Sequence, residues 1–389
     1  MTSGAPASGL PPLAGHRAIY DEDHAIFRDT VRRFASDRIA PNEAEWRTHG
    51  ITPRGIWREA GALGLLCPQV PPAYGGLGLD DYRYRTIMSE EMGSSSLGFG
   101  LQTNVTADYI LNFGTEAQKE SILPGMVSGD TILAIAMTEP GAGSDLRSIR
   151  TTARRDGDHL VINGSKTFIS SGQLCDLVIV AVRTDASEGG AGMSLVLVEA
   201  SREGFRRGRN LRKIGRHGAD TSELFFEDVR VPAGNLLGEE QRGLAHLMVE
   251  LPKERLGIAL SGLVDATRAY ELARDHARER RAFGRAVADF QVNRFALADI
   301  RTELEIGWAF VDRCIVQQCE HRLSAEVAAM AKLWVSEMQG RVVDRCLQLF
   351  GGYGYMEDYE IGRLYVDARA QRLYGGTSEI MREVISRAL

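Results

Sequence analysis

Residues 136–145 read Ala136-Met137-Thr138-Glu139-Pro140-Gly141-Ala142-Gly143-Ser144-Asp145 and follow a short apolar segment, residues 131–135, that predicts a strand. The two glycines and the serine allow backbone N–H groups to approach a flat ring or a phosphate without interference from a Cβ atom. This loop is not the dinucleotide-binding fingerprint, because it lacks a third glycine and a following helix. A glycine-rich strand exit is more often a plain turn, but the complete decapeptide is far more specific and favours a ligand-binding loop.

A second motif in the same region reads Ile162-Asn163-Gly164-Ser165-Lys166-Thr167-Phe168-Ile169-Ser170. Asn163-Gly164 predicts a hairpin turn, and the alternation of the returning strand places Phe168 and Ser170 on one face. An aromatic ring beside a hydroxyl suits a flavin, because the ring can pack while the hydroxyl bonds the isoalloxazine edge. The alternative is an ordinary strand with Phe168 in the core and Ser170 exposed.

Both motifs lie in a region, residues 131–240, that has the composition of a β-domain. Short β-branched runs, such as residues 177–182 and 195–198, are separated by turns rich in Gly and Asp, as at residues 156–158. No helical crossover lies between these runs, so the sequence predicts an antiparallel sheet and not a parallel nucleotide-binding sheet.

The chain on either side of the β-region has helical patterns. Apolar residues recur at helical spacing between residues 20 and 130, and longer helical segments follow between residues 241 and 389. The length of the later segments predicts a four-helix bundle. The predicted fold class is α+β, with an N-terminal helical domain, a middle antiparallel β-domain and a C-terminal four-helix bundle.

The bulk composition argues against several classes of protein. The net charge of −6 disfavours a nucleic-acid binder, and the apolar runs are too short for a membrane span. The five cysteines and the histidines are scattered, which predicts reduced thiols and no metal site. Residues 1–19 are rich in Ala, Ser, Gly and Pro without the layout of a signal peptide, so we expect a disordered tail on a cytoplasmic protein.

Three further motifs lie in the C-terminal region. They are Arg280-Arg281-Ala282-Phe283-Gly284, Gln348-Leu349-Phe350-Gly351-Gly352-Tyr353-Gly354-Tyr355, and Tyr374-Gly375-Gly376-Thr377-Ser378-Glu379-Ile380. Together with the two β-domain motifs, and in the same order, they resemble the acyl-CoA dehydrogenase family from about residue 20 to the C-terminus. The resemblance implies the acyl-CoA dehydrogenase fold, FAD as cofactor, an electron-transfer flavoprotein as acceptor and a homotetramer, a dimer of dimers.

The resemblance also implies which residues bind FAD. In the β-domain they are Ile135, Met137, Thr138, Gly143, Ser144, Phe168, Ile169 and Ser170. In the C-terminal region they are Arg280, Phe283, Gln291, Gln348, Gly351, Gly352, Thr377 and Glu379. The family places Arg280, Phe283, Gln291 and the Gln348–Gly352 group on the FAD of a neighbouring subunit, which implies FAD at subunit interfaces. An arginine suits a pyrophosphate, but Arg280 also lies in a basic cluster that could be a solvated helix end.

The implied reaction removes an α-proton and a β-hydride from a fatty acyl-CoA thioester to give the trans-2-enoyl-CoA, with FAD N5 accepting the hydride. Many members place the basic glutamate directly before Gly-Thr-Ser, where this chain has Gly375. The long-chain and isovaleryl types place it on a C-terminal helix. The segment Glu250-Leu251-Pro252-Lys253-Glu254-Arg255-Leu256 resembles the long-chain type closely, with Glu254 at the base position.

Glu254 is also favoured by a physical argument. A proline inside a helix costs about 3 kcal/mol or more unless the kink is required, and a kink at Pro252 beside a carboxylate is compatible with a cavity. Two alternatives stay open: Glu254 could be an exposed carboxylate paired with a nearby cation, and Glu250 lies one turn earlier on the same face.

The implied substrate-binding residues are Ser144, Pro252, Arg255, Gly375 and Gly376. In the family, a backbone N–H at the Gly375 position and a ribityl hydroxyl of FAD polarise the thioester carbonyl, which acidifies the α-proton. Glycine keeps that N–H and clears space for a base on the helix. Thr377 and Ser378 predict a helix cap.

A basic loop completes the candidate features: Arg206, Arg207, Arg209, Arg212, Lys213 and Arg216. It could contact CoA phosphates or an acidic electron-transfer partner, but a solvated loop is the favoured interpretation. Three functions stay in view: an acyl-CoA dehydrogenase, a flavin oxidase or monooxygenase or carrier-protein-linked acyl dehydrogenase of the same fold, and a non-catalytic flavoprotein.

Overall fold

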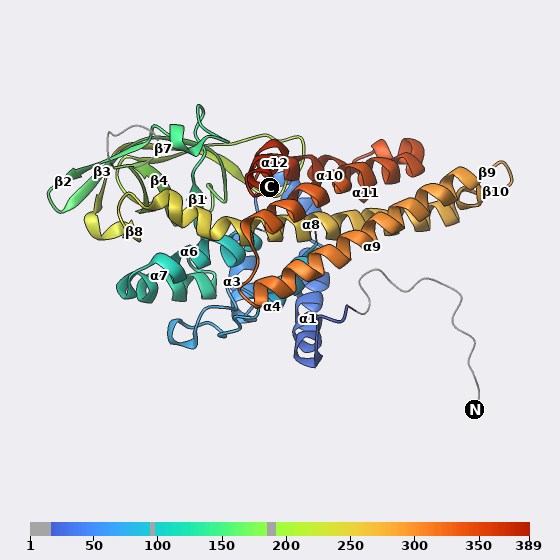
Figure 1. The fold of residues 1–389 in the computed structure, drawn as a ribbon, viewed down its shortest axis with the longest axis horizontal. Helices are drawn as coiled ribbons and strands as arrows, with labels where there is room; N and C mark the ends of the chain where they lie inside the picture. The colour runs from blue at the N-terminus through green and yellow to red at the C-terminus, as the bar shows by residue number, and fades with distance from the viewer. Residues whose placement is uncertain (1–16, 94–97, 185–191) are drawn as a thin grey trace.

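The computed structural model describes residues 17–93, 98–184 and 192–389, and Figure 1 shows its three successive parts. Most of the predicted tail lies outside the described residues. Arg17, which falls within that predicted tail, is held in place: its Nε donates to Asp312 Oδ1 at 2.8 Å and its guanidinium lies 4.3 Å from the centre of the Trp308 ring. The prediction of disorder is therefore wrong for residues 17–19.

The N-terminal part is helical, as predicted. Its main helices are α1 (Glu22–Phe34), α2 (Glu43–His49), α3 (Arg54–Ala62), α4 (Tyr82–Met92), α6 (Ala107–Phe113) and α7 (Glu116–Ser128), with π-helical turns at Ala35–Ile39 and Gln102–Thr106. Val31, Phe34, Trp57 and Ile87 pack into one core cluster. Val31 and Phe34 lie three residues apart, so they share the buried face of α1.

The middle part is a single sheet. Its strands are β1 (Leu133–Ala136), β2 (Thr152–Asp156), β3 (His159–Ser170), β4 (Leu177–Arg183), β5 (Met193–Glu199), β6 (Phe205–Asn210), β7 (Thr221–Pro232) and β8 (Leu236–Leu237). They lie in the order β6-β7-β3-β2-β4-β5-β8, and β1 pairs with β4. The predicted antiparallel arrangement holds for most pairs, but β1 runs parallel to β4 and one β2–β4 bridge is also parallel.

The predicted hairpin turn at Asn163-Gly164 is wrong. Both residues lie inside β3, at a register shift in its pairing with β7, and the β2–β3 turn lies at Gly157-Asp158 instead. Gly164 has φ +151°, and a Cβ atom there would lie 2.5 Å from Thr151 Oγ1. A glycine is needed here because two segments pass close to each other. In the sequence, a glycine with this role cannot be told from a glycine in a turn.

The C-terminal part is helical. It contains α8 (Gly243–Glu279), α9 (Gln291–Cys319), α10 (Ala325–Phe350), α11 (Glu360–Ala368) and α12 (Ser378–Ser386), with a small hairpin of β9 (Arg281–Ala282) and β10 (Arg285–Ala286) between α8 and α9. Three helices are long, and the fourth position of the predicted bundle is shared by α11 and α12, which both pack on α10.

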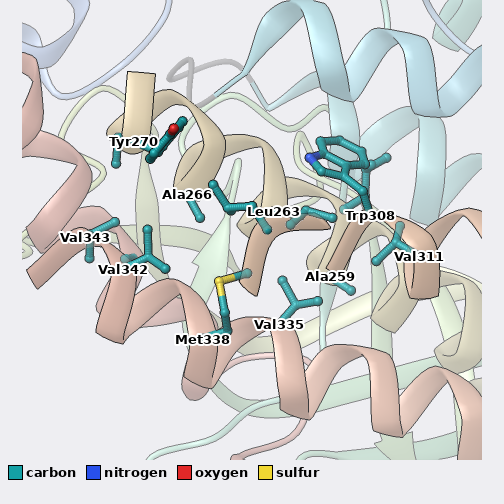
Figure 2. Packing of buried hydrophobic residues seen from close by; sticks show 14 of the residues in the cluster. Ala259, Leu263, Ala266, Tyr270, Trp308, Val311, Val335, Met338, Val342 and Val343 are labelled. Atoms are coloured by element: carbon teal, nitrogen blue, oxygen red, sulfur yellow. The ribbon is translucent and has the colours of Figure 1, made fainter. Parts of the chain in front are cut away.

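Close packing of α8 on α10 and α9 holds the C-terminal part together (Figure 2). Small residues on α8, Ala259 and Ala266, alternate with Leu263 and let Val335 and Met338 of α10 fit between them. Truncating a buried Leu or Met side chain to alanine in such a core lowers the free energy of unfolding by about 2–5 kcal/mol. This core fixes the position of α8, the helix that carries Glu254.

Candidate active site

Glu254 lies on α8, which continues without a break through Pro252. Its Oε1 accepts a hydrogen bond from the Tyr109 hydroxyl of α6 at 3.1 Å. Part of the Glu254 side chain remains accessible, yet protein surrounds its carboxyl closely enough that burial raises its pKa to about 7. Among the described residues Oε2 has no hydrogen-bond partner, so a proton-accepting atom is available.

Glu250, the competing carboxylate, is used differently. It is 1% exposed. Asn112 Nδ2 donates to its Oε1 at 2.6 Å, and Lys253 Nζ forms an ion pair with its Oε2 at 2.7 Å that lacks the geometry of a hydrogen bond. Both oxygens are buried beside partners within the protein, so they are less available to a substrate than Oε2 of Glu254. The geometry therefore favours Glu254 over Glu250, and it disfavours the alternative of an exposed, salt-bridged Glu254.

The Gly375-Gly376 loop is held against the same helix. Both glycines have left-handed backbone angles, φ +65° and +93°. Arg255 Nε lies 3.5 Å from the Gly375 carbonyl oxygen, and Lys332 Nζ of α10 donates to the Gly376 carbonyl at 2.6 Å. Neither glycine N–H has a hydrogen-bond partner within the described parts of the chain, so two backbone donors remain free for a ligand.

The helix that follows begins as predicted. Thr377 is the N-cap of α12, and its hydroxyl accepts from the Ile380 N–H at 3.3 Å. Ser378 is the first helical residue, and its hydroxyl donates to Glu337 at 2.7 Å. Glu379 is exposed in the first turn. The free glycine donors therefore lie directly before the positive end of a helix dipole.

The absence of a side chain at Gly375 has a specific structural reason. A Cβ atom at Gly375 would lie 2.3 Å from Ile258 Cδ1. Ile258 follows Glu254 by one turn on α8, so the space next to the loop is filled by the helix that carries the base. The prediction was that glycine clears space for the base, but the residue that fills this space is Ile258 and not Glu254.

We expect Gly375→Ala to lower the free energy of unfolding by about 1–2 kcal/mol, because it adds a left-handed alanine and a contact with Ile258. Thermal unfolding measures the change. Ile258→Val deletes the contacting Cδ1 atom, so in the double variant part of the loss returns. Gly55→Ala on α3, where a Cβ meets no atom within 4 Å, is the control and has little effect. Equal losses with and without Ile258→Val would contradict the contact.

The two β-domain motifs are brought together. The Thr167 N–H donates to the Thr138 carbonyl at 2.9 Å, which joins the end of β3 to the loop after β1. Ile135 is buried in β1, Met137 and Thr138 are half-buried, and Gly143 and Ser144 are exposed. The space next to the Gly143 Cα is open to at least 4 Å, as a loop that approaches a ligand requires.

A buried ion pair fixes these two motifs to each other. Lys166 Nζ lies 2.8 Å from Glu139 Oε1 and donates to the Met137 carbonyl at 3.1 Å. Glu139 also accepts from the Thr151 N–H at 2.9 Å. Burial lowers the pKa of Lys166 to about 8. Burial opposes ionisation of Glu139 as well, but the bonds from Lys166 and Thr151 hold its pKa below the ordinary value.

The end of β3 presents an exposed aromatic ring. Phe168 is 67% exposed with φ +59°, a backbone angle that is unusual for a residue with a side chain, and Ser170 is exposed as well. Ile169 between them is buried, so both Phe168 and Ser170 reach the surface and the alternative of a core Phe168 is wrong, although a register shift between Lys166 and Ile169 breaks the alternation on which the shared face was predicted. Strained backbone that presents an apolar ring to solvent is typical of a ligand site.

The other predicted cofactor residues gather elsewhere. A hollow of about 500 Å³ is lined by ten residues that include Arg280, Gln348, Gly351 and Gly352. Arg280 lies 5.9 Å from the centre of the Tyr353 ring, which orients it at the rim. Phe283 and Gln291 do not line this hollow: Phe283 is 96% exposed in the β9–β10 hairpin, and Gln291 is exposed at the start of α9.

The two groups of predicted cofactor residues are far apart within one chain. Figure 1 shows the sheet at one end of the molecule and the β9–β10 hairpin, next to Arg280, at the opposite end. One chain therefore presents two separate half-sites.

The basic loop is largely paired within the protein. Arg206 forms an ion pair with Glu227, Arg207 donates to the carbonyls of Gly172 and Cys175, and Lys213 donates to the Ala219 carbonyl at 2.6 Å. Glu223 lies 3.6 Å from Arg209, and Asp367 and Asp265 are among the charges around Arg216, whereas Arg212 is exposed. These contacts support the favoured interpretation and not a docking patch.

Sequence reasoning missed Tyr109 and Lys332. No motif marks Tyr109, because it reaches Glu254 only through the packing of α6 on α8. Lys332 carried a usable signal: it interrupts an apolar run at residues 328–335 and is fully buried in α10. A lysine at a buried position requires an acceptor, which is the Gly376 carbonyl. Lys166 and Glu139 stood within the quoted motifs, but their pairing could not be read from spacing.

Three family models match consecutive parts of the chain: the N-terminal, middle and C-terminal domains of acyl-CoA dehydrogenase match residues 21–130, 134–229 and 241–389. The chain belongs to the acyl-CoA dehydrogenase family. The mitochondrial long-chain specific acyl-CoA dehydrogenase of Sus scrofa is 45% identical, over 96% of this chain and 88% of its own length.

Solved structures of acyl-CoA dehydrogenases agree with the family assignment. The acyl-CoA dehydrogenase of Geobacillus kaustophilus matches with a TM-score of 0.94 and 44% identity, over 96% of this chain and 99% of its own. A glutaryl-CoA dehydrogenase of Mycobacterium smegmatis in complex with FADH2 matches with a TM-score of 0.88 and 28% identity, over 95% of each chain. The predicted family and fold are confirmed.

Acyl-CoA dehydrogenases are FAD flavoproteins, and the residues of this acyl-CoA dehydrogenase fit that cofactor. Four glycines of the two half-sites, Gly141, Gly143, Gly351 and Gly352, have no atom within 4 Å of where a Cβ would lie. Arg280 supplies a cation for a pyrophosphate at one half-site, and Phe168 supplies an aromatic face at the other. Among the residues that the structure describes, no group of side chains could hold a metal ion and no helix is long and apolar enough to span a membrane.

Proposed function

We propose that this acyl-CoA dehydrogenase converts fatty acyl-CoA thioesters of the long-chain type to trans-2-enoyl-CoA, with Glu254 removing the α-proton. The observation that supports this proposal best is the Glu254 carboxylate, which has one oxygen free beside the Gly375-Gly376 loop. The similarity to the long-chain enzyme of Sus scrofa supports the substrate class.

The environment of Glu254 suits a general base. Burial raises its pKa to about 7, so the carboxylate is a stronger base than an exposed glutamate and is still ionised slightly above neutral pH. The Tyr109 hydroxyl occupies Oε1 and orients the carboxyl, which leaves Oε2 to receive the proton. Pro252 precedes Glu254 by two residues. Because proline has no N–H, the backbone carbonyl of Met248, four residues before it, receives no helical hydrogen bond from this position.

The Gly375-Gly376 loop would bind the thioester carbonyl. Removal of the α-proton places negative charge on that oxygen, and preorganised N–H donors stabilise such charge. Arg255 and Lys332 hold the two carbonyls of the loop on the protein side, so the N–H groups are free to point at a ligand. Gly375 thereby serves as a donor while Glu254 serves as the base.

FAD, when bound, supplies the acceptor for the β-hydrogen and its electron pair. The chain would hold the reactive ring with the loop after β1 and the face of Phe168 and Ser170. The FAD of a neighbouring subunit would be held by Arg280, Gln348, Gly351 and Gly352, because the two half-sites lie at opposite ends of the folded molecule (Figure 1). We therefore infer that the chain assembles with FAD at its subunit interfaces. We also propose a homotetramer, an electron-transfer flavoprotein as acceptor and a cytoplasmic location.

Anaerobic bleaching of the FAD-loaded protein tests the function. At subsaturating concentrations we expect long linear acyl-CoA to reduce the flavin at least about tenfold faster than short branched acyl-CoA, since a difference of about 1.4 kcal/mol in binding along the tail gives that factor in the second-order rate. Aerobic turnover with an electron-transfer flavoprotein should yield no hydrogen peroxide. Stoichiometric peroxide would indicate the oxidase, and bleaching only by acyl groups on a carrier protein would overturn the CoA assignment.

A further inference from the structure

A chain of buried charges lies directly behind Glu254. Arg85 of α4 lies 2.7 Å from Asp108 of α6, Lys253 of α8 lies 2.9 Å from the same Asp108 oxygen, and Lys253 lies 2.7 Å from Glu250. Arg85, Asp108 and Glu250 are buried, and Lys253 is half-buried. Two cations and two anions from three helices therefore balance one another beside the proposed base.

Lys253 is the member that joins the two carboxylates. Glu250 and Glu254 are four residues apart and project from one face of α8, so an untethered Glu250 could turn toward the substrate or share its proton. Lys253 precedes Glu254 by one residue and points to a different side of the helix. Its ammonium forms an ion pair with Oε2 of Glu250, and the Asn112 amide donates to Oε1 at 2.6 Å, so each oxygen of Glu250 lies against a group of the protein.

The polar and charged groups around Glu254 lie on α4, α6, α8 and α10. Glu250 and Asp108 raise its pKa, after the larger effect of burial, whereas the Tyr109 hydroxyl and the Arg255 guanidinium lower it. Lys253 and Arg85 stand behind the two neighbouring carboxylates, and Lys332 lies beyond Arg255 on the loop side. Burial opposes ionisation of Asp108, but Arg85 and Lys253 hold its pKa below the ordinary value.

We propose that Lys253 is a positioning residue, which pairs with Glu250 and Asp108, offsets their negative charge and holds Glu250 turned away from the substrate, so that Glu254 is the single proton acceptor of the site. This inference rests on the proposed role of Glu254. The role of Lys253 requires no contact with substrate or cofactor, because it acts through the charge and orientation of its two carboxylate partners.

Opposite charge changes should move the titration of Glu254 in opposite directions. Glu254 must be deprotonated to act, so the rate of flavin reduction rises with pH through its pKa, which lies near 7. Removing the Lys253 cation leaves one more uncompensated negative charge, which favours protonated Glu254 and moves this rise to higher pH. Removing the Glu250 anion leaves one more uncompensated positive charge and moves the rise to lower pH.

The test is the pH dependence of anaerobic flavin reduction by saturating acyl-CoA. We expect Lys253→Met to raise the midpoint by about one unit and Glu250→Gln to lower it by about one unit, as like and unlike charges within a few ångströms do. The double variant should return close to the original midpoint, because the charge is balanced again. Midpoints that stay in place, or that move in the same direction in both single variants, would overturn the proposal.

Two further variants separate positioning from general damage. Lys253→Arg keeps the cation and should keep the midpoint. Lys119→Met is the matched control. It removes the lysine of another Glu–Lys pair three residues apart, Glu116–Lys119 at 3.0 Å on α7, which is partly exposed. This variant should leave the midpoint unchanged. Both Lys253 variants should fold, because a hollow of about 230 Å³ lined by Lys253, Asp108, Arg85 and Asn112 lets water reach the cluster.

Failure of this inference differs from failure of the proposed function. If Glu254→Gln abolishes reduction while the Lys253 and Glu250 variants keep the original midpoint, Glu254 is the base and Lys253 has only a structural role. If Glu254→Gln still reduces with the same pH dependence, the midpoint belongs to another group and the proposed function itself fails.

Discussion

Glu254→Gln is expected to slow the reduction of bound FAD by acyl-CoA by about 10²–10⁴-fold, the contribution of a general base. The amide keeps the size of the side chain and can still accept from Tyr109, but it cannot take the α-proton. FAD content, visible absorbance and affinity for acyl-CoA should stay close to those of the parent, because Glu254 belongs to neither FAD half-site. Stopped-flow mixing without oxygen measures the rate.

Glu250→Gln is the matched control for this variant, since it is the same substitution one turn earlier on α8. It should keep the rate within about tenfold at its own optimal pH, because it alters charge near the base without removing it. Bleaching at the parental rate by Glu254→Gln, or a larger loss in Glu250→Gln than in Glu254→Gln, would move the base away from Glu254.

Lys166→Met is expected to lower the free energy of unfolding by about 3–5 kcal/mol, the usual result when one partner of a buried ion pair is removed. Lys166 is 1% exposed and joins Glu139 to the Met137 carbonyl, so the variant leaves a buried carboxylate with only its backbone donors. Because the pair ties β3 to the loop after β1, we also expect loss of FAD on gel filtration. Thermal unfolding of the FAD-free protein isolates the effect on the chain.

The double variant Lys166→Met/Glu139→Gln should recover a large part of this loss, because it removes both charges together. Arg268→Met gives a control on the surface, where the Arg268–Glu360 pair at 2.6 Å is partly exposed and contributes at most about 1 kcal/mol. Equal destabilisation by the Lys166 and Arg268 variants would show that burial of the Lys166–Glu139 pair has no special effect.

Local pattern was sufficient for much of the fold. The alternation of short β-branched runs gave the sheet, and helical spacing gave α1 and α9, because burial of one face dictates both periods. Asn163-Gly164 was misread because glycine serves two different needs, a hairpin turn and a close approach, and only the neighbouring Thr151 decides between them. The parallel pairing of β1 with β4 was missed because it joins residues that are far apart in the chain.

The candidate site shows the same limit. Glu254, Gly375 and Arg255 were found because they lie in motifs that keep their spacing. Tyr109 and Asn112 contact the site from three-dimensional packing alone, and short stretches of sequence carry no record of such contacts. The apolar run around Lys332 marks it as buried, but its acceptor on the Gly376 loop follows only from the packing. The free N–H groups of Gly375 and Gly376 follow from backbone angles and from Arg255 and Lys332, which a motif cannot specify.

The contact between Ile258 and the Gly375 loop bears on how such enzymes diverge. A glutamate at position 375 would need a left-handed backbone, and its Cβ would lie 2.3 Å from the present position of Ile258 Cδ1. That methyl group is the end of a flexible side chain, so Ile258 would have to turn away or be replaced by a smaller residue. Residues 258 and 375 are therefore coupled through one contact between α8 and the loop, and we expect the two positions to change together.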